Sequence, residues 1–224
     1  MIAAMMVAVV SAKAQFEPGT FSLQPKAGFG VSWLSNMPKL NLGQASSYLS
    51  GVELDKSPVV AAVLGVEAEY QLAPQFSLAA GVNYSLQGSG WKDTNIAVQG
   101  ASFELSDAQV ELGYVTVPVT ANYYLFKGFA VKAGVQFGFL TNAKVKATAK
   151  IGNDKTEDEV DFKDSCKKFD LSIPMGVSYQ FDVPIVLDLR YNLGLTKVNK
   201  ESAPGYDDHK NNLVQLTVGY KFAL

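Results

Sequence analysis

The chain has 224 residues, and its 19 lysines and arginines nearly balance its 21 aspartates and glutamates. This balance leaves no basic surface of the kind that recruits nucleic acid, and the single cysteine, Cys166, excludes a disulfide framework within the chain. After the N-terminus, no apolar run is long enough to predict a membrane-spanning helix.

The first element in chain order is a short apolar segment, Ile2–Val10, which is followed by Ala12-Lys13-Ala14. An apolar stretch before an A-x-A pattern is typical of a secretory signal peptide. We therefore expect residues 1–14 to be a signal peptide and residues 15–224 to form the exported domain. A short buried helix or an N-terminal strand is the alternative interpretation.

Eight segments then alternate large apolar residues with small or polar ones. Alternation with period two indicates β-strands, and roughly 11 to 15 residues per segment is long for a soluble strand. About 9 to 11 tilted residues cross a bilayer, so each segment can cross and still project. The expected strands are 21–33, 60–72, 76–87, 110–125, 129–139, 169–181, 185–195 and 212–224.

The fourth segment, 110–125, contains a proline within its alternation. Val117 and Val119 belong to the apolar face, and Pro118 falls on the opposite face. Because proline has no N–H to donate to a strand ladder, we expect Pro118 at a bulge or a strained register.

The connections between these strands alternate in length. Three are tight, at 73–75, 126–128 and 182–184, and four are long, at 35–58, 88–109, 143–168 and 197–211. Short and long connections alternate in this way in outer-membrane barrels, with turns on the periplasmic side and loops outside. We expect the acidic stretch Asn153–Glu159 to be a mobile charged loop rather than a calcium site.

The two faces of the strands differ in composition. Gly, Ser, Ala, Gln and Asn dominate the polar face, which suits the crowded interior of an eight-stranded barrel. The apolar face carries no charge, and a charge there would cost about 2–4 kcal/mol at the bilayer midplane. We predict an all-β, eight-stranded antiparallel up-and-down transmembrane β-barrel. The alternative is a soluble lipocalin-like lipid-binding barrel with its apolar face inside.

Eight ionisable residues fall on the inward face. Buried charges must be paired, so we predict a structural network in the lumen in which the charges neutralise one another, with Arg190 and Lys132 at its centre. Because of this network, we prefer the interpretation of a plugged barrel to that of a pore. The predicted members are Lys26, Glu67, Glu69, Lys132, Asp170, Asp188, Arg190 and Lys221.

Catalytic patterns are scarce. The only histidine lies in Asp207-Asp208-His209, and some outer-membrane proteases use Asp–His pairs at the rim of the barrel. A lone histidine without a nucleophile or base motif is better read as part of a solvated loop. We find no phosphate loop, metal-ligand spacing or nucleotide motif, so the expectation is a protein that is not an enzyme and has no cofactor or metal.

The segment 212–224 should close the barrel. An open strand edge in hydrocarbon would leave backbone groups without hydrogen bonds, so the last strand must pair with the first. Its ending, Thr217-x-Gly219-x-x-Phe222-x-Leu224, also resembles the C-terminal signal that barrel-assembly machinery recognises.

Three stretches carry a family resemblance: FSLQPKAGFGVSW at the start, YVTVPVTANYYL at 114–125, and the closing LTVGYKFAL. Together they resemble the outer-membrane β-barrel domain family of Bacteroidetes that is called PorT-like. In that family the fourth strand reads Y-L-x-I-P-L-x-x-x-Y, which Tyr114, Val117, Pro118, Val119 and Tyr123 match. The architecture is similar to that of the small OmpA/OmpX-type barrels. The resemblance implies the fold and an outer-membrane location, but it gives almost no information about activity.

These observations favour a structural or surface-interaction role, including an accessory role in secretion or adhesion. The implied partners are outer-membrane lipid, the assembly machinery at the C-terminal strand, and a protein or glycan at the extracellular loops. A small channel is the main alternative function. Exposed loop aromatics are candidate contact residues unless they pack among themselves; they are Tyr48, Trp91, Phe103, Phe162 and Tyr206.

Overall fold

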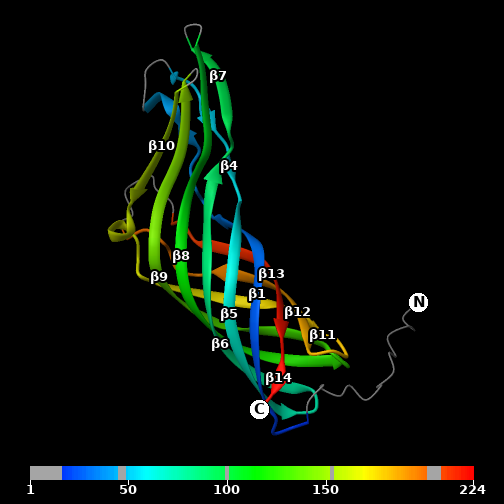
Figure 1. The fold of residues 1–224 in the computed structure, drawn as a ribbon. Coiled ribbons are helices and arrows are strands. Elements are labelled where there is room, and N and C mark those ends of the chain that lie inside the picture. Colours follow the sequence, from blue (N-terminus) through cyan, green and yellow to red (C-terminus); the bar gives the residue numbers. More distant parts are fainter. Residues whose placement is uncertain (1–16, 45–48, 99–100, 152–153, 201–207) are drawn as a thin grey trace, which may run out of the picture.

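The fold is a ring of eight antiparallel strands, seen in Figure 1 as the lower part of the molecule. The computed structural model describes residues 17–44, 49–98, 101–151, 154–200 and 208–224. The expected signal peptide, Tyr48 and Tyr206 lie outside these ranges. In ring order the strands are β1 (Phe21–Leu34), β5 (Val59–Ala73), β6 (Phe76–Trp91), β8 (Ala101–Phe126), β9 (Phe129–Ile151), β11 (Phe169–Gln180), β12 (Ile185–Gly194) and β13 (Asn211–Tyr220).

The ring closes between its first and last strands. β1 pairs with β13 from Lys26↔Gly219 to Leu34↔Asn211. The short strand β14 (Phe222–Ala223) continues the same register, with Ser22 opposite Ala223. The predicted closure by the C-terminal segment is therefore present, and it leaves no open edge in the ring.

The pleat of each ring strand places apolar side chains outside and polar ones inside. In β12, Leu187 and Leu189 are exposed on the outer wall, whereas Asp188 and Arg190 are each only 1% exposed. A lipocalin-like barrel would have the opposite orientation, so that alternative is excluded.

Aromatic pairs mark two levels of the outer wall. Phe126 stacks on Phe129 at 4.8 Å near the tight turns, and Phe139 meets Phe169 edge-on at 5.9 Å near the opposite end. Along β9, the tilted strand between Phe129 and Phe139 rises roughly 25 Å, which is the height of the apolar band of an outer-membrane barrel. The two levels are therefore spaced as interface girdles.

Two strands continue far beyond the ring and form a projecting sheet. β8 has 26 residues and β9 has 23, so much of the expected loops at 88–109 and 143–168 is strand. β7 (Thr94–Val98) pairs with β8, and β10 (Asp154–Asp161) pairs with β9. We call β7, β10, residues 101–111 of β8 and residues 144–151 of β9 the arm; it forms the upper part of Figure 1.

Bulges explain why period-two alternation did not reveal the arm. The β8–β9 register shifts between Ser106 and Gln109, where Asp107 has a φ of 53°, and again between Gly113 and Tyr114. After each extra residue, the side chains that face inward belong to the other of the two alternating sets of positions. The stretch expected to be a mobile charged loop is also mostly strand, because Glu159 of β10 faces Lys144 and Lys146 of β9.

Pro118 does not lie at a register shift, contrary to expectation. The β6–β8 ladder passes from Ala80↔Val119 to Asn83↔Thr116 in unchanged register, without paired residues between them. The missing N–H of Pro118 is thus accommodated by a short gap in the ladder rather than by a bulge.

The remaining elements lie in the connections. They are β2 (Leu40–Asn41), the 3-10 turn η1 (Leu42–Gln44), β3 (Glu53–Leu54), β4 (Lys56–Ser57) and the 3-10 turn η3 (Lys163–Ser165). β2 pairs with β3, and β4 pairs with the end of β6. Within the described ranges, no helix has the length and apolar content needed to cross a membrane.

Candidate functional site

Five charged side chains meet inside the ring, and we call them the lumen cluster. Glu67 contacts three cations, with Lys26 Nζ at 2.6 Å, Lys132 Nζ at 2.8 Å and Arg190 Nη2 at 3.1 Å. Asp188 accepts from Lys132 Nζ and from Arg190 Nη2, both at 2.8 Å. Arg190 is the largest fully buried side chain among the described residues.

The lumen cluster crosses the barrel. Glu67 is on β5, Lys132 on β9 and Arg190 on β12, and none of these strands is a neighbour of another in the ring. Charges this deeply buried persist only when they are paired and hydrogen-bonded. The cluster therefore links opposite walls through the space that a pore would need.

A second set of contacts lies nearer the tight turns. Glu69 accepts hydrogen bonds from Tyr124 Oη at 2.5 Å and Ser77 Oγ at 2.7 Å. Its other carboxylate oxygen is 2.9 Å from Lys221 Nζ. Lys221 is in the break between β13 and β14, so this ion pair ties the closing strand to β5.

Asp170 lies apart from the other seven predicted lumen residues. Its carboxylate accepts a hydrogen bond of 2.6 Å from Thr196 Oγ1. Among the described residues it makes no ion pair within 4.0 Å. The expectation that all eight charges share one network is therefore corrected, because Asp170 is the second residue of β11, at the loop end of the ring and above the cations.

Neutral hydrogen bonds cross the lumen above the lumen cluster. The backbone N–H of Gly88 donates to Ser32 Oγ at 2.7 Å, and Ser32 Oγ donates back to the carbonyl of Gly88 at 3.0 Å. Asn211 Nδ2 donates to Gln87 Oε1 at 2.7 Å. Because these residues come from β1, β6 and β13, they also join walls that are not adjacent.

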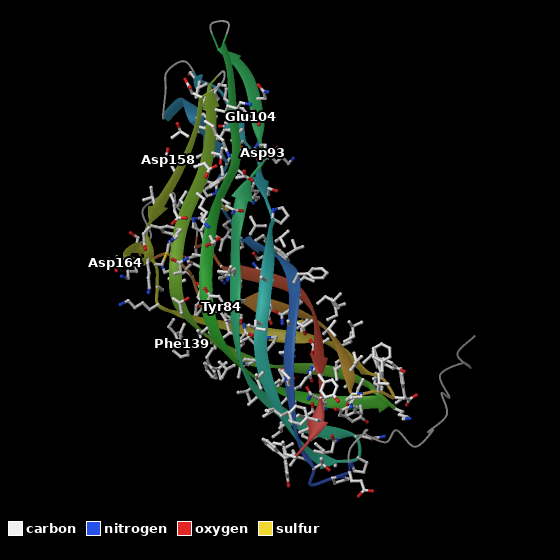
Figure 2. The ribbon with its side chains drawn as sticks, in the orientation of Figure 1. Tyr84, Asp93, Glu104, Phe139, Asp158 and Asp164 are labelled. Carbon is white, nitrogen blue, oxygen red and sulfur yellow. The ribbon has the colours of Figure 1, made fainter. Side chains whose placement is uncertain are left out.

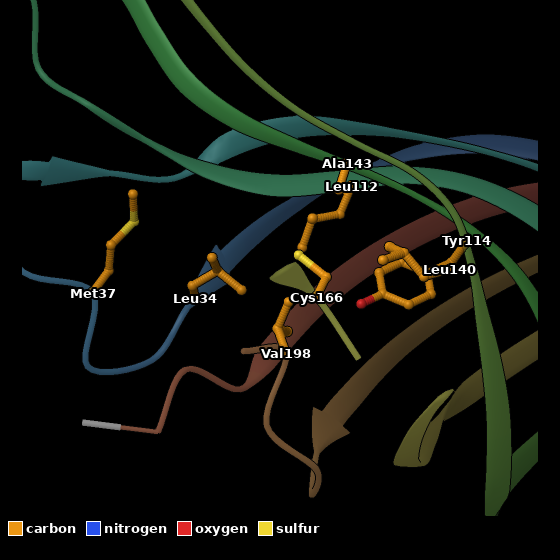
Figure 3. Packing of buried hydrophobic residues seen from close by; sticks show 8 residues of the cluster. All are labelled: Leu34, Met37, Leu112, Tyr114, Leu140, Ala143, Cys166 and Val198. Carbon is orange, nitrogen blue, oxygen red and sulfur yellow. The ribbon is translucent and has the colours of Figure 1, made fainter. Parts of the chain in front are cut away.

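The interior becomes apolar where the ring meets its connecting segments. Figure 3 shows the packing, in which Cys166 and Val198, from two connections, lie beside Leu112 of β8. We call this layer the mouth cluster. Its members are Leu34, Met37, Leu112, Tyr114, Leu140, Ala143, Cys166 and Val198.

A cavity of about 270 Å³ adjoins the mouth cluster, and we call it the mouth pocket. Met37, Trp91, Val110 and Phe162 supply much of its apolar lining. Ser165, Asn199 and His209 are its polar lining residues. Sequence analysis did not predict this pocket, because its walls come from six separate stretches of the chain.

His209 and Cys166 both line this pocket. His209 Nδ1 is 3.3 Å from the carbonyl oxygen of Ser35, and its backbone N–H donates to Asn199 Oδ1 at 3.3 Å. Burial raises the pKa of the Cys166 thiol to about 11, so the thiol is protonated and poorly nucleophilic at neutral pH. Within the described ranges, no cluster of three His, Cys, Asp or Glu could hold a metal ion.

The loop aromatics that the structure describes are half-buried. Trp91 packs against both the mouth cluster and a second apolar cluster built on Leu42, Leu54 and Leu105, and its Nε1 donates to the carbonyl of Pro38 at 3.0 Å. Phe162 packs against the mouth cluster and Phe103 against the second cluster. These three side chains thus pack against apolar clusters of the protein.

The mouth residues left a weak signal in the sequence. Leu34, Leu112 and Leu140 are large apolar residues on the otherwise polar phase of their strands, each near a loop end. Such a switch from polar to apolar residues predicts that the interior of the barrel becomes apolar near the loop end. The contributions of Cys166 and Val198 had no periodic signal, because both lie outside the regular strands.

The outer surface changes from apolar to charged at the level of the mouth cluster. In Figure 2, Tyr84 and Phe139 lie on the wall of the ring, whereas Asp93, Glu104 and Asp158 lie on the projecting part. Exposed apolar residues therefore face outward around the ring, and carboxylates face outward above it. This change fits a membrane boundary near Phe139.

A family model described as an outer membrane protein β-barrel domain matches residues 13–200. The chain belongs to this family. Family membership and the apolar outer wall together place the protein in the outer membrane, with lipid around the ring.

The solved structures that are similar to the chain include the following two proteins. Ail, the attachment invasion locus protein of Yersinia pestis, was solved in complex with the heparin analogue sucrose octasulfate; it is 13% identical, with a TM-score of 0.42, covering 92% of this chain and 100% of that one. Neisserial surface protein A is 14% identical, with a TM-score of 0.45, covering 90% of this chain and 97% of that one. A search of curated proteins finds no match.

Proposed function

We propose that the protein is a plugged outer-membrane barrel whose arm contacts a protein or glycan partner outside the cell. The observation that carries this proposal is the long β8–β9 ladder, which runs, with three register shifts, from Phe126↔Phe129 at the tight turn to Phe103↔Ile151 in the arm. A ladder of this length fixes the arm to the barrel as a paired sheet. Binding residues are commonly displayed in this way on a rigid scaffold.

The charged faces of the arm are the proposed contact surface. All residues of β10 are exposed, and they include Glu157, Asp158 and Glu159. Trp91, Phe103 and Phe162 stabilise the arm and the mouth from within under this proposal, and Tyr48 and Tyr206 remain candidate contacts. A partner with a basic or hydrogen-bonding surface fits β10 best.

A binding experiment on native outer membranes tests this role. Tagged protein is cross-linked and captured, and the unaltered chain is compared with a Glu157→Lys/Asp158→Lys variant. The matched control is Asp182→Lys, in a tight turn at the opposite end of the barrel. A partner that is lost with the arm variant and kept with the turn variant supports the proposal; equal capture with all three proteins contradicts it.

The side chains that fill the barrel support a role that does not involve conducting ions. Glu67 binds three cations across the lumen, and the mouth cluster adds an apolar layer above them. A small channel is the second candidate, because lumen atoms such as Gln24 Nε2, Asn83 Oδ1 and Thr217 Oγ1 lack protein hydrogen-bond partners among the described residues, which favours internal water. Large, stable conductance of the purified protein in planar bilayers would select the channel.

The remaining roles are narrower proposals. The motif from Tyr114 to Tyr123 supports placement among PorT-like barrels of Bacteroidetes, and the ending at Phe222 and Leu224 supports recognition by assembly machinery. We also propose that the protein is not an enzyme and needs no cofactor. Loss of a hydrolytic activity in an Asp208→Ala/His209→Ala variant would contradict that view.

A further inference from the structure

We propose that the mouth pocket binds a small, uncharged, apolar molecule about the size of two fused rings. Its volume is about 270 Å³. An enclosed apolar cavity of roughly 150 Å³ takes up benzene, so a cavity almost twice as large accepts a second ring. This site is additional to the proposed partner surface on the arm, and it does not depend on the identity of that partner.

The lining selects against charge. The indole N–H of Trp91 already donates to the carbonyl of Pro38 at 3.0 Å, and the ring nitrogen Nδ1 of His209 lies 3.3 Å from the carbonyl of Ser35. Most of the surface offered to a ligand is therefore hydrocarbon and aromatic carbon. A charged molecule would lose most of its hydration against this mainly apolar lining.

The position of the pocket allows entry from outside but no passage through the barrel. Met37, Phe162 and Val198 belong to three different connecting segments, and these segments form the wall at the loop end. Toward the ring, Leu112 and Tyr114 are fully buried, and the lumen cluster lies beyond them. The geometry thus describes a binding site at the outer mouth rather than a transport route.

The chain contains its own reporter for the test. Of its two tryptophans, only Trp91 lines the pocket, so Trp33→Phe leaves a single fluorophore at the site. The full chain in phosphatidylcholine vesicles is titrated with 1-naphthylamine, which is uncharged at neutral pH and accepts energy from tryptophan. We expect saturable quenching at one site, competition by naphthalene, and no competition by naphthalene-1-sulfonate, which has the same rings and a charge.

Two variants separate the pocket from partitioning into lipid. Val198→Phe fills the cavity and should weaken binding about tenfold or more, whereas the matched Val218→Phe, on the lipid-facing wall, should leave it unchanged. Quenching that does not saturate and is equal in both variants would overturn the proposal. Equal competition by the sulfonate would also overturn it.

A measurement without a pocket mutation covers the case in which Val198→Phe fails to fold. Cys166 is the only thiol of the chain and lines the pocket. Alkylation of the unaltered chain by N-ethylmaleimide should slow roughly tenfold at a 1-naphthylamine concentration of about ten times Kd. An unchanged alkylation rate at saturating probe would refute the site.

Discussion

The lumen cluster and the mouth cluster occupy the same barrel interior but have opposite chemistry. In the lower part, Glu67 and Arg190 are buried and ionic. In the upper part, Leu112 and Leu140 are buried and apolar. The outer surface changes in the opposite sense, from apolar around the ring to charged on the arm.

The surroundings explain this reversal. Where the wall faces hydrocarbon, exposed apolar side chains cost nothing, and the polar residues must turn inward and pair with one another. Above the membrane the outside is water, so apolar side chains gain free energy by moving inside. One pair of strands, β8 and β9, follows both rules along its length, and its register shifts at Asp107 and Gly113 lie toward the loop end, where the buried side chains change from polar to apolar.

The largest expected effect comes from Glu67→Ala in the lumen cluster. It removes the carboxylate shared by Lys26, Lys132 and Arg190 and leaves three buried cations with only Asp188. Breaking a buried ion pair on one side costs about 3–5 kcal/mol. Urea unfolding in lipid vesicles measures the loss, and Glu157→Ala on the exposed arm should leave stability nearly unchanged.

Leu112→Ala tests the apolar half of the comparison. Leu112 is fully buried in the mouth cluster, and truncating such a leucine costs about 2–5 kcal/mol. The same change at Leu64, which is 64% exposed on the lipid-facing wall, removes little packing and should cost well below that range. If both variants lose equal stability in the same urea titration, the two regions do not differ as described.

Leu189→Arg tests the lipid-facing wall directly. An arginine near the bilayer midplane costs about 2–4 kcal/mol, so the folded fraction in vesicles should fall. Val160→Arg is the matched control, because Val160 is also exposed, at 61% against 47% for Leu189, but lies on the arm, in water. A similar loss in both variants would mean that the ring is not surrounded by hydrocarbon at Leu189.

Lowering the pH should destabilise the arm before the ring. Among the four predicted changes in stability, this one should be the smallest. The hydrogen bond from Lys144 lowers the pKa of Glu159, and the one from Lys155 lowers the pKa of Glu157. A carboxyl with a lowered pKa stabilises the fold above its ordinary value, about 4.3, and this contribution disappears as the pH falls through the lowered pKa. Hydrogen exchange, corrected for the intrinsic rate, should show β10 losing protection below that pH while β12 keeps it.

Sequence reasoning was sufficient for the wall. Unbroken alternation in segments such as 185–195 assigns Leu189 outward and Arg190 inward, because a single residue shift would exchange the two faces. The same alternation identified the inward charges, although it could not show that Asp170 lies at the loop end, too far up the barrel to meet the cations.

The arm and the mouth were beyond this kind of reasoning for a physical reason. The bulge at Asp107 and the register shift at Gly113 change the phase of the alternation, so a pattern that is continuous in space is broken in sequence. The mouth cluster also depends on Cys166 and Val198, whose positions are set by tertiary packing rather than by any local period.

The ion pair between Lys221 and Glu69 has a consequence for how the barrel shuts. If the terminal strand zipped onto β1 one step out of register, the ammonium of Lys221 would point into the acyl chains, and Tyr220 and Phe222 would be forced among the carboxylates. Only the correct alignment returns the positive charge to Glu69. The ion pair at the C-terminal end of the barrel thus disfavours a misaligned closure when the first and last strands of the sheet pair.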